Sequence, residues 1–462
     1  NWWRVQFGDE YGYVRKTDTG YATAREIKNL NTSYKNTKNY FITGKKVTVY
    51  EQKTLGKLIP IGKLEHAQIY PIATDYGNWW RIIYLDKIGY VRKDDVHLYK
   101  DINVSEIVRE YRTKDTSDSM DRISWFFIKP SKNYLLNAER ILKEDKYYIT
   151  GVGTFDFSKG IPWGEKPQGF KESDDERSYF RVLHAHFFLA DLIQAYRDTG
   201  NKRYIEKGYL ILEDWIKKNP YNNPQSSLAW HDEGTARRLA NWINYYDSAR
   251  KILNANQLKI LLRSMDEQAD LLLSNNFHNS YTNHGMYQDE ALLIYSDYFD
   301  NTEKSRVYNQ VAQQRLKEYF DFIISKEGVH LEHSPGYHQY IAESVKGYID
   351  FFKSKNNREG INYYTNIYNK MGEYFTWVIK PDGKLPLIGD TFSNVEPNPS
   401  LWSDNNYYIF SRTAGKEGIQ PSGYSKIFPE AGYAIFREWH KGIDSTYVHF
   451  TAAYHTQYHK HS

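Results

Sequence analysis

A series of amphipathic helical segments constrains the fold of this chain more than any other feature. With short breaks between them, apolar residues recur at helical spacing over residues 180–199, 203–218, 232–253, 256–275, 284–300, 303–324, 335–353 and 362–380. Short connections make consecutive helices antiparallel, so every second helix points the same way. The segments therefore predict helical hairpins packed into a layered toroid of paired helices, which we place at residues 101–383.

An internal repeat marks a different, strand-rich region before these helices. The sequence "NWWRVQFGDEYGYVRKTD" at 1–18 recurs as "NWWRIIYLDKIGYVRKDD" at 78–95. Each copy predicts two short strands joined by a turn, and further strand-like runs lie between the copies. The pattern resembles the bacterial SH3-like (SH3b) module. The resemblance implies one full all-β module at 40–100 and the tail of a preceding module at 1–19.

A second β region follows the helices. The runs "KLPLIGDTF", "GYAIFREW" and "STYVHFTAAY" predict strands, and we expect residues 384–462 to begin a C-terminal antiparallel β domain. Exposed sheet edges are normally covered by more strands, so we expect the protein to continue beyond Ser462.

Composition excludes several classes of function. The 61 Lys and Arg nearly balance the 57 Asp and Glu, which argues against a nucleic-acid binder but allows a local basic cleft for an acidic ligand. No run of 18 apolar residues occurs, so no membrane span is expected. The absence of cysteine excludes disulfides, thiolate metal sites and cysteine nucleophiles.

The starts of alternate helices bring chemically useful side chains to one rim of the predicted toroid. Counted from residue 180, the third, fifth and seventh helices begin near His231, Asn283 and Ser334. Helix N-termini offer free N–H donors that suit a carboxylate. Tyr337 lies in the first turn after Ser334, where the helix dipole favours the phenolate, so we expect its pKa to be lowered.

Each of these residues also has a structural interpretation. Asn283 can be a helix N-cap, His231 and His284 can be surface residues of a first turn, and Tyr337 can belong to the core. An alternative enzyme, a glycoside hydrolase on the same toroid, would draw its acid and base from the first-turn carboxylates Asp232, Glu233, Asp289 and Glu290. A non-catalytic glycan or cell-wall binding protein is the third alternative.

Four motifs together resemble the heparinase II/III-like polysaccharide lyases. They are "NHG" at 283–285, "SPGYHQY" at 334–340, "GDTF" at 389–392 and "HKHS" at 459–462. The resemblance extends from about residue 130 to the end. It implies an α/α toroid followed by an antiparallel β-sandwich-like domain, and an enzyme that cleaves a uronic-acid-containing glycan by β-elimination.

The resemblance also implies roles for individual residues. Asn283 and His284 would hold and neutralise the substrate carboxylate, Tyr337 would be the catalytic acid or base, and His459 would be a second catalytic histidine. No cofactor is required for this chemistry. His461 matches a position that in some members helps bind a structural zinc in the C-terminal β domain.

Further residues are candidates for contacts with the sugar chain. His231, Arg237 and Arg238 suit acidic sugars, and Trp163 and Trp230 suit stacking on sugar faces. The expected partner is a uronate polysaccharide, with the bacterial cell wall as a second partner through the SH3b-like modules. We expect a secreted or cell-surface protein whose signal peptide is not in the given chain.

Overall fold

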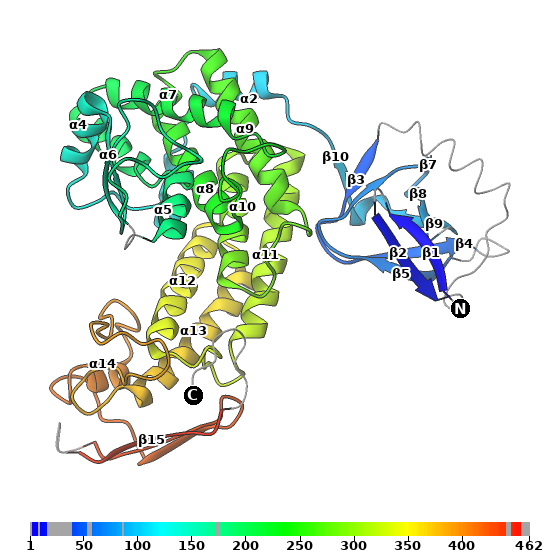
Figure 1. The fold of residues 1–462 in the computed structure, drawn as a ribbon. Coiled ribbons are helices and arrows are strands. Elements are labelled where there is room, and N and C mark those ends of the chain that lie inside the picture. Colours follow the sequence, from blue (N-terminus) through cyan, green and yellow to red (C-terminus); the bar gives the residue numbers. More distant parts are fainter. Residues whose placement is uncertain are drawn as a thin grey trace. The chain divides into compact units, whose positions relative to one another are not determined.

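The protein is described here from a computed structural model that covers residues 2–7, 10–15, 39–52, 58–85, 87–171, 175–439 and 445–453, the first two ranges by their backbone only. The chain divides into two compact units, whose main helices and strands are labelled in Figure 1. Unit one comprises Asn1–Met120 and Phe126–Arg315, and unit two comprises Asp121–Trp125 and Leu316–Ser462.

The N-terminal part of unit one is built from short antiparallel strands. They are β1 (Trp2–Phe7), β2 (Glu10–Arg15), β3 (Tyr40–Ile42), β4 (Val47–Gln52), β5 (Leu58–Leu64), β6 (Ile69–Pro71), β7 (Thr74–Tyr76), β8 (Trp79–Tyr84), β9 (Lys87–Arg92) and β10 (His97–Tyr99). One sheet has the order β5-β4-β9-β8-β7 and another the order β10-β3-β6. Alternate apolar residues such as Val47 and Val49 are buried with Ile82 and Val91 in a small core.

The sequence repeat is also a structural repeat. Strands β1 and β2 pair so that Trp2 lies opposite Arg15, and strands β8 and β9 pair so that Trp79 lies opposite Arg92. The two pairs of strands therefore share one register, and the predicted strands are confirmed in both copies. Whether these strands form SH3b modules stays a prediction.

Helices make up the rest of unit one, with one β-hairpin between them. The elements are α2 (Val104–Tyr111), α3 (Ser117–Ile123), α4 (Tyr134–Glu144), β11 (Lys146–Ile149), β12 (Gly153–Asp156), α5 (Glu176–His184), α6 (Leu189–Thr199), α7 (Arg203–Lys218), α8 (Asp232–Ala249), α9 (Ala255–Leu273), α10 (Asn283–Tyr298) and α11 (Glu303–Ile323), of which α3 and α11 continue into unit two. The predicted segments from residue 203 onward are confirmed to within a few residues. The segment 180–199 is instead two helices, because the backbone of His186 is left-handed (φ 56°) and ends the helical path.

Helix α10 lies at the centre of the helical part of unit one. All of its residues from Gly285 to Tyr298 are buried, so other elements enclose it on every side. Helix α8 packs alongside it and is itself largely buried. This packing fixes the bodies of α8 and α10 and leaves their first turns partly exposed.

Unit two contains a helical hairpin and a small sheet. Its elements are α12 (Pro335–Ser354), α13 (Arg358–Val378), α14 (Asn406–Arg412), β13 (Ser425–Phe428), β14 (Tyr433–Arg437) and β15 (Tyr447–Thr451). The strands form an antiparallel sheet in the order β13-β14-β15. Tyr374 of α13 packs against Phe428 and Tyr433, with ring centroids 5.3 and 6.0 Å away, and so joins the sheet to the hairpin.

The C-terminal strand predictions are partly confirmed. "GYAIFREW" and "STYVHFTAAY" contain β14 and β15, whereas "KLPLIGDTF" at 384–392 forms no strand and the prediction is wrong. Pro386 has no N–H to donate to a ladder, and the shorter run "SKIF" pairs with β14 instead. The predicted domain limits and the toroid stay predictions.

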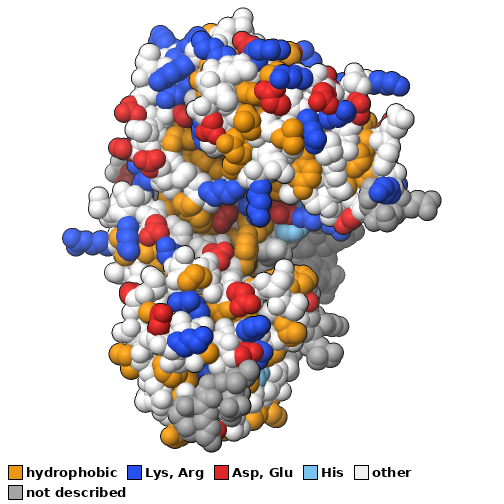
Figure 2. Space-filling view, turned by 90° about the vertical axis from the view of Figure 1, so that its left-hand side faces the viewer, with side chains coloured by type: hydrophobic (Ala, Val, Ile, Leu, Met, Phe, Trp, Pro, Cys, Tyr) orange, Lys and Arg blue, Asp and Glu red, His pale blue; other side chains and the backbone are white. Residues whose placement is uncertain are grey.

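The surface agrees with the near balance of charges in the composition. On the face in Figure 2, Lys and Arg side chains are interspersed with Asp and Glu. Among the described residues, no helix combines the length and apolar character needed to cross a membrane.

Candidate functional site

The start of α8 carries one imidazole and two carboxylate groups in sequence. His231 is the N-cap residue, followed by Asp232 and Glu233 in the first turn. The Nδ1 of His231 lies 3.0 Å from Asp232 Oδ1, whereas the Gly234 N–H is 3.5 Å from the same nitrogen. The shorter contact fits a hydrogen bond donated by His231 to Asp232.

The start of α10 carries the amide side chain of Asn283, which is not the N-cap of the helix. Thr282 is the N-cap and accepts a hydrogen bond from the Gly285 N–H at 3.1 Å, so the alternative of Asn283 as the cap is wrong. Asn283 is exposed, and within the described residues its side chain has no hydrogen-bond partner. The amide is therefore available to a ligand, next to His284.

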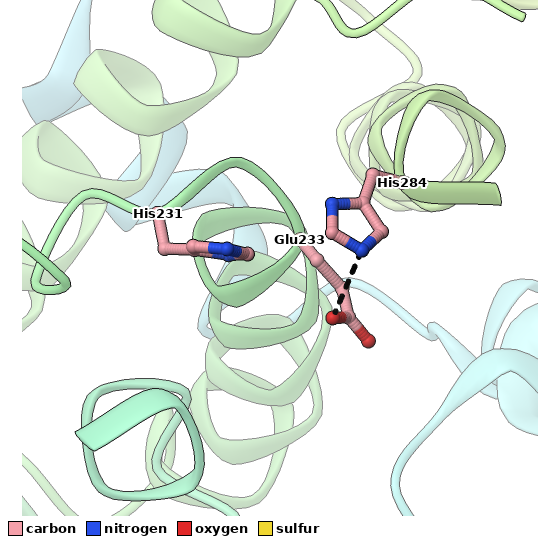
Figure 3. Close-up of side chains that lie close together, drawn as sticks. All are labelled: His231, Glu233 and His284. Carbon is pink, nitrogen blue, oxygen red and sulfur yellow. Dashed lines mark ion pairs between the residues drawn. The ribbon is translucent and has the colours of Figure 1, made fainter. Parts of the chain in front are cut away.

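Of the three helix starts predicted to share one rim, those of α8 and α10 meet in unit one. The rings of His231 and His284 lie 5.4 Å apart. His284 donates from Nδ1 to Asp232 Oδ1 at 3.0 Å, and its Nε2 lies 3.7 Å from Glu233 Oε2 (Figure 3). Two imidazoles and two carboxylates from neighbouring helices thus lie close together.

Charge is distributed unevenly over this cluster. Arg181 of α5 forms an ion pair with Glu233, which neutralises that carboxylate. The hydrogen bond to Asp232 is the main reason that the pKa of His284 is raised, although burial and Arg181 act in the opposite direction. Since the side chain of His284 is 25% exposed, a protonated ring there can reach an acidic ligand.

The glycine of "NHG" is required by a close backbone contact. A Cβ at Gly285 would lie 2.3 Å from the carbonyl oxygen of Asn279. The same carbonyl accepts a hydrogen bond from Thr282, and the Asn279 side chain donates to Asp232 Oδ2 at 2.9 Å. The loop before α10 is therefore tied to both helix starts, which sequence reasoning did not detect.

One group of described side chains could hold a metal ion. The ligand atoms of His231, Glu233 and His284 all lie within 4.8 Å of one another. Two features oppose the binding of a cation there. Arg181 already forms an ion pair with Glu233, and the N-termini of two helices carry partial positive charge. The electrostatics suit an anion better.

The start of α12, which lies in unit two, carries the predicted Tyr337. Ser334 is the N-cap, as predicted, and Thr391 of "GDTF" contacts Ser334 Oγ at 3.1 Å and accepts from the Gly336 N–H at 3.1 Å. Tyr337 is half-buried and donates to Asp390. The motifs at 334–340 and 389–392 therefore pack together, and Asp390 is a partner of Tyr337 that sequence reasoning missed.

The predicted pKa of Tyr337 is wrong in direction. Burial raises this pKa, and the carboxylates of Asp390 and Glu332 raise it further. These effects outweigh the helix dipole, so Tyr337 is a neutral phenol at neutral pH and can donate a proton.

Several predicted substrate contacts lie inside the protein. Trp163 and Arg238 are fully buried: the indole of Trp163 donates to Asp214, and the guanidinium of Arg238 donates to backbone carbonyls and lies 4.1 Å from the ring centre of Trp215. Trp230 is also buried. We assign these side chains to the support of α8 in place of the predicted substrate contacts.

Arg237 remains accessible beside the cluster. Its side chain is 24% exposed, and its guanidinium carbon lies 3.6 Å from the ring centre of Tyr287. His459 and His461 lie outside the described residues, so their predicted roles stay predictions.

The carboxylates proposed for a glycoside hydrolase lack the environment that this role needs. Asp289 and Glu290 are buried, and Asp289 contacts His278 at 3.0 Å and Arg315 at 3.6 Å. Burial would raise the pKa of Asp232, but hydrogen bonds from His231, His284 and Asn279 hold it well below its usual range. None of these groups is a free, accessible carboxylic acid.

The structure defines a helical protein with a following β region, and its helix starts carry the NHG and SPGYHQY motifs. The sequence profile of the heparinase II/III N-terminus matches residues 107–407, and the chain belongs to this family.

Relatives and solved structures agree with this assignment. The chain is 24% identical over 302 residues to a heparin-sulfate lyase of Bacteroides thetaiotaomicron (60% of this chain, 42% of the relative) and 22% identical over 306 residues to one of Pedobacter heparinus (63% and 45%). The crystal structure of the heparan sulfate lyase HepC from Pedobacter heparinus superposes with a TM-score of 0.56 at 18% identity, covering 77% of this chain and 57% of that chain. A heparinase III structure gives a TM-score of 0.59 at 18% identity (76% and 57%). The chain spans about half the length of the curated relatives it matches.

Proposed function

We propose that this chain is part of a polysaccharide lyase that cleaves a uronic-acid-containing glycan by β-elimination. One observation carries the proposal: Asn283 offers an exposed amide without a partner among the described residues, beside a His284 ring held by a carboxylate. Family membership and the names of the heparin-sulfate lyase relatives support the same reaction.

The chemistry explains why an amide and an imidazolium belong together. The proton on C5 of a uronate is weakly acidic, because the adjacent carboxylate is already negative. Hydrogen bonds from Asn283 and from Nε2–H of His284 to this carboxylate would stabilise the charge that develops as C5 loses its proton. The amide does not titrate, so its contribution is independent of pH.

The elimination also needs an acid and a base. As the base removes the C5 proton, the electron pair forms a double bond between C4 and C5, and the bond from C4 to the glycosidic oxygen breaks. We assign protonation of that oxygen to Tyr337, whose raised pKa keeps it a phenol. We assign the base to His459, following the family resemblance.

Two neighbouring side chains are proposed to bind the sugar chain. His231 faces His284 across the cluster, and Arg237 presents its guanidinium near the same helix start. An acidic polymer would meet these groups together with the helix N-termini.

A product assay tests the proposal. Heparin and heparan sulfate are the first polymers to try, followed by hyaluronan and alginate, with ultraviolet absorbance of the unsaturated uronate as the readout. We expect absorbance to rise with one or more of them. New reducing ends without ultraviolet absorbance would indicate a hydrolase, and binding without cleavage of any polymer would indicate a glycan-binding protein.

We further propose a secreted or surface-associated protein whose N-terminal strands bind the bacterial cell wall. The partly exposed Trp79 packs edge-on against Tyr50 at 5.4 Å and lies beside Arg92, a surface that suits glycan or peptide contacts. Co-sedimentation with Gram-positive cell walls should weaken in Trp79→Ala and persist in Leu85→Ala, a change of another exposed side chain in the same module. Equal sedimentation of both variants and the wild type would oppose the proposal.

A further inference from the structure

One carboxylate in unit one holds three polar side chains from different segments. Asp232 Oδ1 accepts from the Nδ1 atoms of His231 and His284, both at 3.0 Å. Asp232 Oδ2 accepts from the Asn279 side chain at 2.9 Å, and the Glu233 N–H donates to Oδ1 at 2.7 Å. Both oxygens of Asp232 therefore accept hydrogen bonds, Oδ1 from three donors and Oδ2 from one.

These hydrogen bonds fix the carboxylate in its charged form and in one orientation. Asn279 binds the oxygen that the imidazoles leave free, so rotation of the carboxylate would break contacts on both sides. Asp232 is 19% exposed in its side chain, which limits competition from water.

The groups around His284 make Asp232 its strongest electrostatic partner. Asp232 binds Nδ1, Glu233 lies 3.7 Å from Nε2, Arg181 pairs with Glu233, and the ring of His231 faces it at 5.4 Å. Because Arg181 offsets the charge of Glu233, the net attraction on the imidazole comes mainly from Asp232.

We propose that Asp232 is a positioning residue that takes the Nδ1–H of His284 and thereby turns Nε2–H toward the acidic group of the substrate. The inference deepens the proposed function and rests on it. Without Asp232 the imidazolium would lose the acceptor of its Nδ1–H, so the ring could lose its charge or rotate, and Nε2–H would lose its fixed direction next to Asn283.

This assignment differs from a role as acid or base. A carboxylate that accepts from two imidazoles, an amide and a backbone N–H is held in its charged form, with its pKa well below the usual range, and so does not suit a general acid. Asp232 acts through His284 and does not need to touch the sugar.

The test compares Asp232→Asn with Glu233→Gln in the 462-residue chain. Each variant replaces a carboxylate near His284 by an amide, but only the first changes the group bound to Nδ1. Histidine-selective 15N labelling, with His284→Ala to assign the signal, reports which ring nitrogen carries the proton. We expect His284 to keep its proton on Nδ1 at high pH in the wild type and in Glu233→Gln, and to lose this preference in Asp232→Asn.

The variant that changes the 15N signal of His284 should also lose activity. We expect Asp232→Asn to lower kcat by about 10- to 100-fold, as for a reacting group displaced by about 1 Å, with a smaller change in KM. An unchanged His284 tautomer in Asp232→Asn, or equal changes in both variants, would overturn the inference. If Asp232→Asn fails to fold, Asn279→Ala keeps the test open, because it frees Asp232 Oδ2 and should weaken the same preference.

The experiment separates this inference from the proposed function. The nitrogen spectrum reports the hold of Asp232 on His284 without any substrate. A wild-type chain that shows the expected tautomer but forms no unsaturated product from any uronate polymer would refute the lyase and leave the hydrogen-bond arrangement standing. Unsaturated product with no effect of Asp232→Asn on His284 would refute only the positioning role.

Discussion

Replacement of Gly285 by alanine should damage both stability and activity. Alanine has the better helix propensity by about 1 kcal/mol, so a glycine in the first turn of α10 would ordinarily be improved by this change. Here the new Cβ would lie 2.3 Å from the carbonyl oxygen of Asn279. Cβ atoms rarely approach other heavy atoms within 3.0 Å, so the two must separate by at least 0.7 Å (3.0 minus 2.3).

The loop has little freedom to make this movement. The Asn279 carbonyl is bound by Thr282, and the Asn279 side chain is bound to Asp232. Overpacking of this kind costs about 1–3 kcal/mol, which exceeds the gain in propensity. At about 2–4 °C per kcal/mol for a domain of this size, we expect a fall in Tm of a few degrees.

Gly234 provides a matched control. It occupies the third position of α8, as Gly285 does in α10, and its N–H faces the N-cap residue in the same way. A Cβ at Gly234 would meet only His231 Cβ, at an ordinary 3.6 Å. Gly234→Ala should therefore leave Tm unchanged or raise it.

Differential scanning calorimetry and the ultraviolet assay would measure the two consequences. Movement of Asn279 would disturb Asp232 and His284, so Gly285→Ala should lose activity by about 100-fold if the displacement approaches 1 Å. Equal Tm and equal activity in Gly285→Ala and the wild type would refute the reasoning.

Four further predictions follow from the site. Tyr337→Phe should abolish turnover while binding of polymer, measured by affinity electrophoresis, is nearly unchanged, because only the transferable proton is lost; near wild-type turnover would contradict the acid role. Asn283→Ala should lower kcat more than it raises KM, because its partner charge is largest in the transition state, and a pure loss of affinity would point to ground-state binding. Asp390→Asn should lower the pKa of Tyr337, since burial would remain but the nearest carboxylate would be lost, so the alkaline limb of the kcat profile should move to lower pH; an unmoved limb would exclude this coupling. Treatment with EDTA should leave activity unchanged, because Arg181 occupies the carboxylate that a metal at His231 and His284 would need; loss of activity restored by a divalent metal would oppose this.

The sequence was sufficient to locate the helix starts that carry the candidate residues. Ser334 followed by proline is a strong N-terminal signal, and the start of α10 was predicted at Asn283, with which the helix begins. These signals are local, involving residues within one turn, and local interactions are what a single sequence encodes most directly. The break between α5 and α6 was missed because it depends on the left-handed backbone of His186, for which no glycine or proline gave a signal.

The partners of the site residues could not be predicted in the same way. His284 and Asn279 lie 52 and 47 residues from the carboxylate of Asp232 that they share, and only the packing of α8 and α10 brings them together. The pKa of Tyr337 also depends on residues distant in the sequence. Its position in the first turn of α12 suggested a lowered pKa. Its burial and the carboxylate of Asp390, which the packing of "GDTF" supplies, reverse that direction.

The caps explain why reactive side chains can stand at these helix starts. A first turn has N–H groups that need acceptors, and a polar residue there usually supplies one. In α10 and α12 the preceding Thr282 and Ser334 take this role. Asn283 and Tyr337 are thereby released from capping, while the buried bodies of the helices still fix their positions. The remaining N–H groups and the positive ends of the helices attract anions, so the same feature that stabilises each helix start also suits the carboxylate of the proposed substrate.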